Sequence, residues 1–168
     1  QRGLSCADCH MPYISEGGVK YTDHHIMSPL AHIDRTCQTC HRQSAETLRQ
    51  NVYDRQKKVY DFALKVNREL ANAHIYAKFA WDKGATEAEM KQCLSDIRKS
   101  QWRWDYSLAS HGAAFHAPQE VERLLGYSMM YAKDAQLQAQ RVAAKHGFTG
   151  QIPLPDISTR EKAAKYIG

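Results

Sequence analysis

The sequence contains little of several features that define broad protein classes. Of its 168 residues only nine are glycine and five are proline, which excludes a collagen-like, low-complexity or linker-dominated chain. No apolar run approaches the roughly 18 residues that cross a bilayer, and mean hydropathy is -0.63, so we expect no transmembrane segment. An initiator methionine and an apolar leader are also missing, so we expect a piece of a longer, exported protein.

The charge is not extreme in either direction. Lysine and arginine number 23 against 18 aspartates and glutamates, which leaves a formal net charge of +5. This mildly basic balance is a weak indication of acidic partners, and we expect no nucleic-acid partner. Hydrophobic residues make up 43% of the chain, as in ordinary globular domains.

Five cysteines are present, and four of them form two pairs with the same pattern. The segments are Cys6-Ala7-Asp8-Cys9-His10 and Cys37-Gln38-Thr39-Cys40-His41. C-x-x-C-H is the attachment signature of c-type haem, because two thiols at this spacing reach the vinyl groups on one porphyrin edge and the histidine binds the iron. We therefore predict two covalently attached haem c groups, with thioether cysteines and proximal histidines at Cys6, Cys9, His10, Cys37, Cys40 and His41.

Other uses of the same cysteines are less consistent with the pattern. A zinc site could take two C-x-x-C pairs, but zinc gives no reason for a histidine directly after both. A thioredoxin-like redox motif needs a βαβ context, which the sequence does not show. A disulfide between cysteines so close in sequence is a strained way to stabilise a fold.

The chain has two regions that differ in composition and in hydrophobic periodicity. Residues 1–43 contain both motifs and little periodicity, so we expect a loop-rich dihaem-binding segment with a turn at Gly17-Gly18. This segment has few apolar side chains, and the porphyrins are expected to supply its core. Residues 44–168 show helical periodicity throughout. The predicted fold class is therefore all-α, a multihaem cytochrome in which long helices follow the dihaem segment.

The first predicted helix begins after Ser44 and ends near Asp82, with Gly84 as its stop signal. Its length of roughly 38 residues corresponds to about 57 Å. Because a small domain cannot bury so long an apolar stripe, we expect it to pack on another long helix or a second subunit, with antiparallel pairing inside the chain as the alternative. The stripe consists of Leu48, Val52, Val59, Phe62, Val66, Leu70, Ala73, Ala77 and Ala80.

Three further helices are predicted. Thr86 and Glu89 form a capping box for the second, which runs to about residue 111. Pro118 begins the third, which ends near residue 146. An extended connector precedes a short last helix, capped by Ser158 and Glu161 and ending at Gly168. Cys93 and most of the tryptophans and tyrosines are expected in the core.

Low-spin haem also requires a sixth ligand, and seven further histidines are available. His116 precedes a helix in an aromatic setting and is a candidate, as is His24 in the haem-rich segment. His74 on the long helix is more typical of a surface or core residue, and His146 suits a helix C-terminus. His25, His32 and His111 are undecided on spacing alone.

These segments together resemble the C-terminal part of the pentahaem cytochrome c nitrite reductases, which reduce nitrite to ammonia. The resemblance covers nearly the whole chain, and the two C-x-x-C-H motifs look like the family's fourth and fifth haem sites. Its other segments are Tyr21-Thr22-Asp23-His24, Gly84-Ala85-Thr86-Glu87-Ala88-Glu89-Met90-Lys91, Gln101-Trp102-Arg103-Trp104-Asp105, His111-Gly112, His116-Ala117-Pro118 and Pro155-Asp156-Ile157-Ser158-Thr159.

The resemblance implies a role for each matching residue. His116 looks like the distal ligand of the haem at Cys6 and Cys9, and His24 looks like the distal ligand of a haem whose own motif lies outside this chain. The long helices look like the family's homodimer interface. The resemblance also implies a periplasmic location and a separate multihaem cytochrome as the electron donor. The two haems here would be electron relays.

Some motifs of the family are missing from this sequence, and their absence predicts which functions this chain does not have. The family's catalytic haem uses a C-x-x-C-K motif, and none occurs in these 168 residues. The family's calcium ligands are absent as well, although calcium is expected in an intact member. Residues 1–5 contain no histidine to serve as the distal ligand at Cys37 and Cys40, so that haem is expected to be five-coordinate or bound by His25 or His32. The chain alone should not reduce nitrite. A free-standing dihaem electron carrier is the alternative.

Overall fold

A computed structural model describes residues 3–167, which form two compact units. The motif unit comprises residues 3–57, and the bundle unit comprises residues 58–167. Helix α2 (Ala45–Asp82) contributes residues to both. Within the described residues no helix combines the length and the apolar composition that crossing a bilayer requires.

The motif unit begins with a short helix, α1 (Cys6–His10), and a β-hairpin. Strands β1 (Tyr13–Glu16) and β2 (Val19–Thr22) are antiparallel, and their turn is formed by Gly17-Gly18, which confirms the predicted turn. Both glycines have positive φ, 58° and 83°, a conformation that other residues adopt at a cost. The strands themselves were not expected. Each has only four, mostly exposed residues, so no apolar alternation marks them in the sequence.

Two short 3₁₀ turns complete the motif unit, η1 (Pro29–His32) and η2 (Cys37–Thr39). Very little of this unit is apolar core. Between residues 3 and 57 the buried hydrophobic side chains are Ile33 and Leu48, and neither extended apolar cluster of the protein includes a residue from this region. The motif unit therefore has a folded backbone with almost no hydrophobic interior of its own.

Helix α2 has the predicted limits. The Ser44 hydroxyl accepts a hydrogen bond from the Thr47 backbone N–H (3.2 Å) at its start. At its end Gly84 has φ +94°, and the Ala85 N–H donates back to the Ala80 carbonyl (3.1 Å), which closes the last turn.

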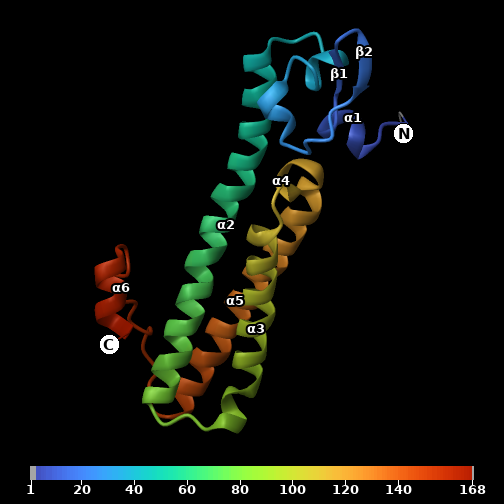
Figure 1. Ribbon diagram of the computed structural model, residues 1–168. Coiled ribbons are helices and arrows are strands. Elements are labelled where there is room, and N and C mark those ends of the chain that lie inside the picture. Colours follow the sequence, from blue (N-terminus) through green and yellow to red (C-terminus); the bar gives the residue numbers. More distant parts are fainter. Residues whose placement is uncertain (1–2, 168) are drawn as a thin grey trace. The chain divides into compact units, whose positions relative to one another are not determined.

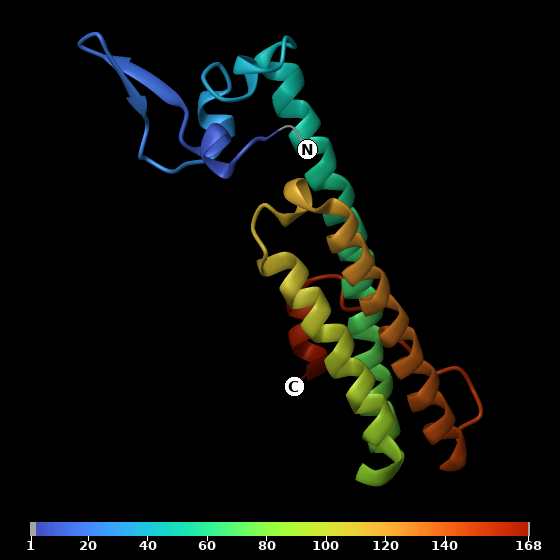
Figure 2. The same ribbon diagram turned by 90° about the vertical axis from the view of Figure 1, so that its right-hand side faces the viewer.

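The bundle unit is built from three long helices that lie side by side in both views (Figures 1 and 2). Helix α3 (Glu87–Ala109) runs antiparallel to α2, and α5 (Pro118–Lys145) runs parallel to α2. The capping box of Thr86 and Glu89 and the first-turn Pro118 occur as predicted.

Small residues line the contact between α3 and α5. Ala132, Ala135 and Ala139 of α5 are fully buried, and the Cys93 thiol of α3 lies 3.4 Å from the Ala135 carbonyl oxygen. Such short side chains let the two backbones approach closely. The prediction that Cys93 is a core residue is confirmed, and burial raises the pKa of its thiol to about 11.

Most of the apolar stripe of α2, from Val59 to Ala80, is covered inside this chain. Val59, Ala63 and Val66 pack with Val121 and Leu125 of α5. Further along, Leu70, Ala73, Ala77 and Ala80 pack against both α3 and α5. The helix length predicted packing on another long helix or on a second subunit, with pairing inside the chain as the alternative. From Val59 to Ala80 the stripe packs on two long helices of the same chain.

Polar contacts also join the three helices. Ser100 and Ser128 are fully buried, and each hydroxyl lies 2.8 Å from the other residue's backbone carbonyl. The Trp104 indole N–H donates to the Ala63 carbonyl (3.0 Å), and the Gln136 amide donates to the Glu69 carbonyl (2.8 Å). These contacts fix the rotation of each helix about its axis, which apolar packing alone specifies weakly.

The expectation that most aromatic side chains are buried is wrong. Trp102 is 58% exposed and stacks on the exposed Tyr106 with ring centroids 5.4 Å apart, and Trp81 is 39% exposed. Trp104 is partly buried. A three-helix bundle has a narrow core. Because alanines fill much of this core, the large aromatic rings lie at the surface.

The last helix, α6 (Arg160–Ile167), follows the predicted connector, in which Ile152 is buried. Its cap differs from the prediction. The Thr159 hydroxyl, one residue after Ser158, accepts from the Lys162 backbone N–H (3.3 Å), and the Ser158 N–H instead donates to the Asp156 carboxylate (3.0 Å). Two adjacent hydroxyl residues can both serve as caps, and the Asp156 turn decides between them. The predicted end at Gly168 lies outside the described residues.

The start of α3 is joined to the end of α5 by a contact between Glu89 and His146. The Glu89 carboxylate accepts from the Thr86 N–H and hydroxyl, both at 2.9 Å, and lies 3.0 Å from Nε2 of His146. The Thr86 N–H, then His146, hold the pKa of Glu89 at about 2, below its ordinary value of 4.5.

This depressed pKa predicts an acid-sensitive contribution to stability. A carboxylate with a lower pKa in the folded state stabilises the fold above pH 4.5 and loses that effect as the pH falls towards 2. We expect Glu89→Gln to lower the urea midpoint of unfolding at pH 7, and the difference from the unmodified protein to disappear near pH 2. Glu87→Gln, which removes the same charge two residues earlier in the first turn of α3, is the control. An equal difference at both pH values would contradict the prediction.

Candidate functional site

The first motif is carried by α1, which brings Cys6 and Cys9 to neighbouring positions one helical turn apart. The Asp8 carboxylate accepts from the Ser5 backbone N–H (2.6 Å) and hydroxyl (2.8 Å), and the backbone N–H contributes most to lowering the pKa of Asp8. Both thiols are exposed and free. The helix therefore presents two reduced thiols at the separation that C-x-x-C-H attachment requires.

His10 at the end of α1 is held in the form that binds iron. Its Nδ1 lies 2.9 Å from the Met27 carbonyl oxygen, which can only accept, so Nδ1 carries the proton. A neutral imidazole protonated at Nδ1 has its lone pair on Nε2. Metal-binding histidines commonly donate their second ring N–H to a carbonyl in this way. This geometry fits the predicted role of His10 as a proximal ligand.

The second motif is organised by two threonines. Thr36 is buried, and its hydroxyl oxygen lies 2.9 Å from the Pro29 carbonyl and 2.7 Å from the His32 carbonyl. The Thr39 hydroxyl donates to the Thr36 carbonyl (2.5 Å), and the His41 N–H donates to the Cys37 carbonyl (2.9 Å). These bonds hold the second motif around the 3₁₀ turn η2.

The two motifs lie near one another within the motif unit. Partial burial raises the pKa of the Cys9 thiol, and the neighbouring Cys37, Asp8, Cys40 and Cys6 raise it further. All four thiols are free. Across residues 3–167 no three His, Cys, Asp or Glu side chains lie close enough together to hold a metal ion.

The donor set fits covalently bound haem. Thioether attachment requires free thiols at C-x-x-C spacing, and iron binding suits a histidine protonated at Nδ1, as His10 is. The motif unit also has almost no apolar core of its own, and a bound porphyrin would supply one. Exposed apolar side chains in the same unit, including Leu4, Val19 and Ile26, are available to cover porphyrin surface.

His24 lies in a tight turn after β2. Its Nδ1 donates to the Thr22 carbonyl (2.8 Å), so the lone pair is again on Nε2, and the side chain is exposed. The next residue, His25, donates from both its backbone N–H (3.0 Å) and Nδ1 (2.9 Å) to Asp23. The His25 backbone N–H is the main cause that lowers the pKa of the buried Asp23. His24 thus has the local geometry of a ligand, and its assignment to a particular haem stays a prediction.

His116 ends the short helix α4 (Ala113–His116) in the bundle unit. Its ring is exposed and lies edge-on to Phe115 with centroids 5.6 Å apart. Gly112 before it has φ +82°, and a Cβ at that position would lie 3.4 Å from the His116 ring. The short loop therefore leaves the imidazole beside a residue without a side chain. Its role as distal ligand for the first motif stays a prediction.

The remaining histidines differ in their surroundings. His146 pairs with Glu89, and His74 and His111 are exposed. His32 is half-buried in η1. Asp23 and Met27 were not predicted as hydrogen-bond partners of histidines. The Asp-His-His order was a usable signal for Asp23, whereas the Met27 carbonyl carries no sequence signal at all.

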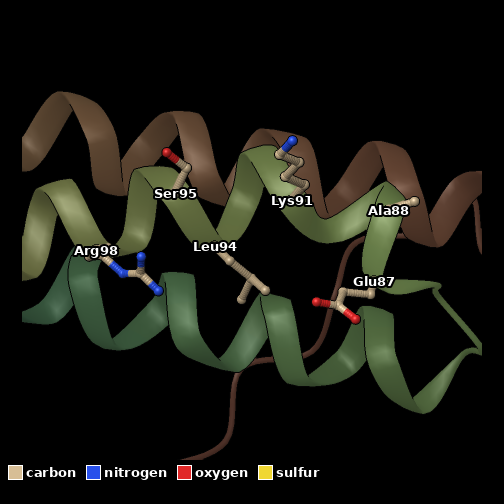
Figure 3. A pocket seen from close by; sticks show the side chains of 6 residues that line it. All are labelled: Glu87, Ala88, Lys91, Leu94, Ser95 and Arg98. Atoms are coloured by element: carbon tan, nitrogen blue, oxygen red, sulfur yellow. The ribbon is translucent and has the colours of Figure 1, made fainter.

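A surface hollow occurs on α3, away from both motifs in the chain. Figure 3 shows that all of its lining side chains project from this one helix. None of them is a predicted haem residue. They are Glu87, Ala88, Lys91, Leu94, Ser95 and Arg98.

Comparison with known proteins gives consistent relatives. The model of the cytochrome c552 family matches residues 1–168. Over all 168 residues the chain is 64% identical to a cytochrome c-552 of Porphyromonas gingivalis and 52% identical to one of Maridesulfovibrio salexigens. These alignments cover 34% and 33% of the two relatives, so the chain spans about a third of their length.

A solved structure is similar as well. It is the cytochrome c nitrite reductase of Desulfovibrio desulfuricans ATCC 27774, described for two calcium sites in its catalytic subunit. The similarity covers 89% of this chain and 33% of that chain, with a TM-score of 0.74 and 33% sequence identity. The predicted all-α fold of a multihaem cytochrome is thereby confirmed.

Proposed function

This chain belongs to the cytochrome c552 family, and we propose that it is the electron-relay part of a nitrite reductase that converts nitrite to ammonia with six electrons. The observation that carries the proposal is the pair of C-x-x-C-H motifs in one unit, with free thiols and an Nδ1-protonated His10. The likeness to a solved cytochrome c nitrite reductase supports the reaction assigned to the whole protein.

In this proposal the motif unit binds two haem c groups. Bound haem supplies reversible one-electron exchange between ferric and ferrous iron. Cys6 and Cys9 attach the first group, and Cys37 and Cys40 attach the second. His10 and His41 would each supply a histidine ligand to one of the two irons.

Two further histidines are assigned as distal ligands in this proposal. His116 would be the second histidine ligand of the first haem, and His24 would be a ligand of a haem attached elsewhere in the full-length protein. Both have exposed imidazoles, and the Nδ1 bond of His24 directs its Nε2 lone pair outward. Two imidazole ligands on one iron suit electron transfer, because they leave no position open for substrate.

The chemistry of nitrite reduction is assigned to the rest of the protein. The chain holds about a third of the length of its relatives and has no C-x-x-C-K motif, so it should be inactive alone. Calcium is expected in the intact protein, as in the D. desulfuricans enzyme, with ligands from outside these residues.

The assembly we propose is a periplasmic homodimer that receives electrons from a separate multihaem cytochrome. Exposed apolar side chains on helix α2 support a dimer: Tyr60, Leu64 and Trp81 are 56%, 49% and 39% exposed. Apolar side chains on an uncovered helix face are typical of protein interfaces.

The proposal is tested by comparing this chain with the full-length protein, both produced with haem maturation. With reduced methyl viologen as donor, the full-length protein should form ammonia from nitrite, and the chain should be reduced by the same donor without forming ammonia. Ammonia production by the chain alone would refute the assignment of catalysis to other residues. A full-length protein without nitrite reduction would refute the proposed reaction.

The distal ligand has its own prediction. We expect His116→Ala to convert one of the two haems attached to this chain from low spin to high spin, because its iron loses the sixth ligand. Absorption and electron paramagnetic resonance spectra of the oxidised protein measure the change. His111→Ala, a neighbouring exposed histidine, should leave the spectra unaltered. An unchanged low-spin spectrum in His116→Ala would rule out this ligand.

A further inference from the structure

Asp23 is an unusual residue in the motif unit because its carboxylate is buried. Only 6% of the residue is exposed, and the other buried carboxylate in residues 3–167 is Asp96, in the bundle unit. Burying a carboxylate is unfavourable unless hydrogen bonds replace its water. Asp23 lies next to His24, in a unit with almost no apolar core to hold the chain in place.

The hydrogen bonds of Asp23 fix the backbone on both sides of His24. On the upstream side, the Asp23 N–H donates to the Pro12 carbonyl (2.8 Å), next to the paired ends of the hairpin at Tyr13 and Thr22. On the downstream side, the Asp23 carboxylate accepts from the His25 backbone N–H (3.0 Å). The backbone is therefore held at Asp23, directly before His24, and at the peptide group between His24 and His25.

The imidazole of His25 strengthens the same turn. It is 89% exposed, yet its Nδ1 donates to the Asp23 carboxylate (2.9 Å), whose side chain is 8% exposed. One carboxylate oxygen thus accepts two donors from one residue. His24 itself is exposed, and its ring is oriented by the Thr22 carbonyl. The turn holds the backbone while the His24 ring extends outward.

We propose that Asp23 is a positioning residue for the iron ligand His24. The inference rests on the proposed function, in which His24 binds a haem of the full-length protein. Asp23 does not touch that haem. It holds the turn so that His24 needs little further ordering when it binds, and this slows ligand dissociation.

The test uses the full-length protein with its haems attached. Carbon monoxide binds a ferrous bis-histidine haem only after one histidine dissociates, so the slow phase of CO binding to the reduced protein reports ligand opening. With the two Asp23 hydrogen bonds lost, Asp23→Ala should increase the rate of this phase by about tenfold. Intact mass should show an unchanged number of covalent haems.

Two further variants separate positioning from charge. Asp23→Asn keeps an oxygen that accepts the His25 backbone N–H and should remain within about threefold of the unmodified protein. His25→Ala keeps that backbone bond as well and should likewise have a small effect. A CO-binding rate in Asp23→Ala equal to that of the unmodified protein would overturn the inference. So would an Asp23→Asn protein as impaired as Asp23→Ala, because charge would then be the cause.

His24→Ala distinguishes failure of the inference from failure of the proposed function. It should convert one haem fully to high spin. If His24→Ala leaves every haem low spin, His24 is no ligand and that part of the proposed function fails. If His24→Ala has its effect and Asp23→Ala has none, only the positioning role fails.

Discussion

Replacing Cys37 and Cys40 together by serine should remove one covalently attached haem and leave the other in place. Serine cannot form a thioether to a vinyl group, and neither remaining motif cysteine belongs to the second site. Intact mass under denaturing conditions should fall by one haem, and the reduced c-type absorption per protein should fall by about half, since two equivalent chromophores become one. The matching Cys6 and Cys9 double variant should lose the other haem.

Cys93→Ala is the control for loss of a cysteine. Cys93 is buried against α5 and has no histidine beside it, so this variant should keep both haems. Retention of two covalent haems in the Cys37 and Cys40 variant would show that the motif does not attach haem. Tight zinc binding by an uncoloured protein would instead favour the metal alternative.

When the protein is produced without haem maturation, we expect residues 11–43 to be unfolded and the bundle unit to be folded. The motif unit has only Ile33 and Leu48 as buried hydrophobic side chains, which cannot offset the conformational entropy lost when its loops are ordered. The bundle has two extended apolar clusters of its own. Hydrogen exchange followed by mass spectrometry should show unprotected amides in residues 11–43 and strong protection along α3 and α5.

The haem-bearing protein provides the comparison for this experiment. With haem attached, the amides of Asp23 and His41, which donate to backbone carbonyls in the motif unit, should exchange slowly. If they are equally protected with and without haem, the unit folds without porphyrin, and haem is not its core. Loss of protection in the bundle as well would show that the two units are coupled in stability.

Much of this protein could be predicted from the sequence because the relevant signals are local. The C-x-x-C-H spacing specifies an attachment chemistry within five residues. The limits of α2, α3 and α5 follow from Ser44, Gly84, Thr86 with Glu89, and Pro118, because caps and breakers act within one helical turn. The apolar stripe of α2 was likewise visible, since residues on one helix face recur every three or four positions.

The tertiary structure decided which residues pack against these helices and which groups bond to the histidines. Periodicity shows that α2 has an apolar face, but only the packing of α3 and α5 shows that this chain covers it from Val59 to Ala80. The surface positions of Trp81 and Trp102 depend on the narrow, alanine-rich interior. The carbonyl of Met27 that orients His10 comes from 17 residues away, and the hydrogen bonds of Asp23 require a particular turn. Backbone groups are the same in every residue, so their partners are set by the folded path of the chain.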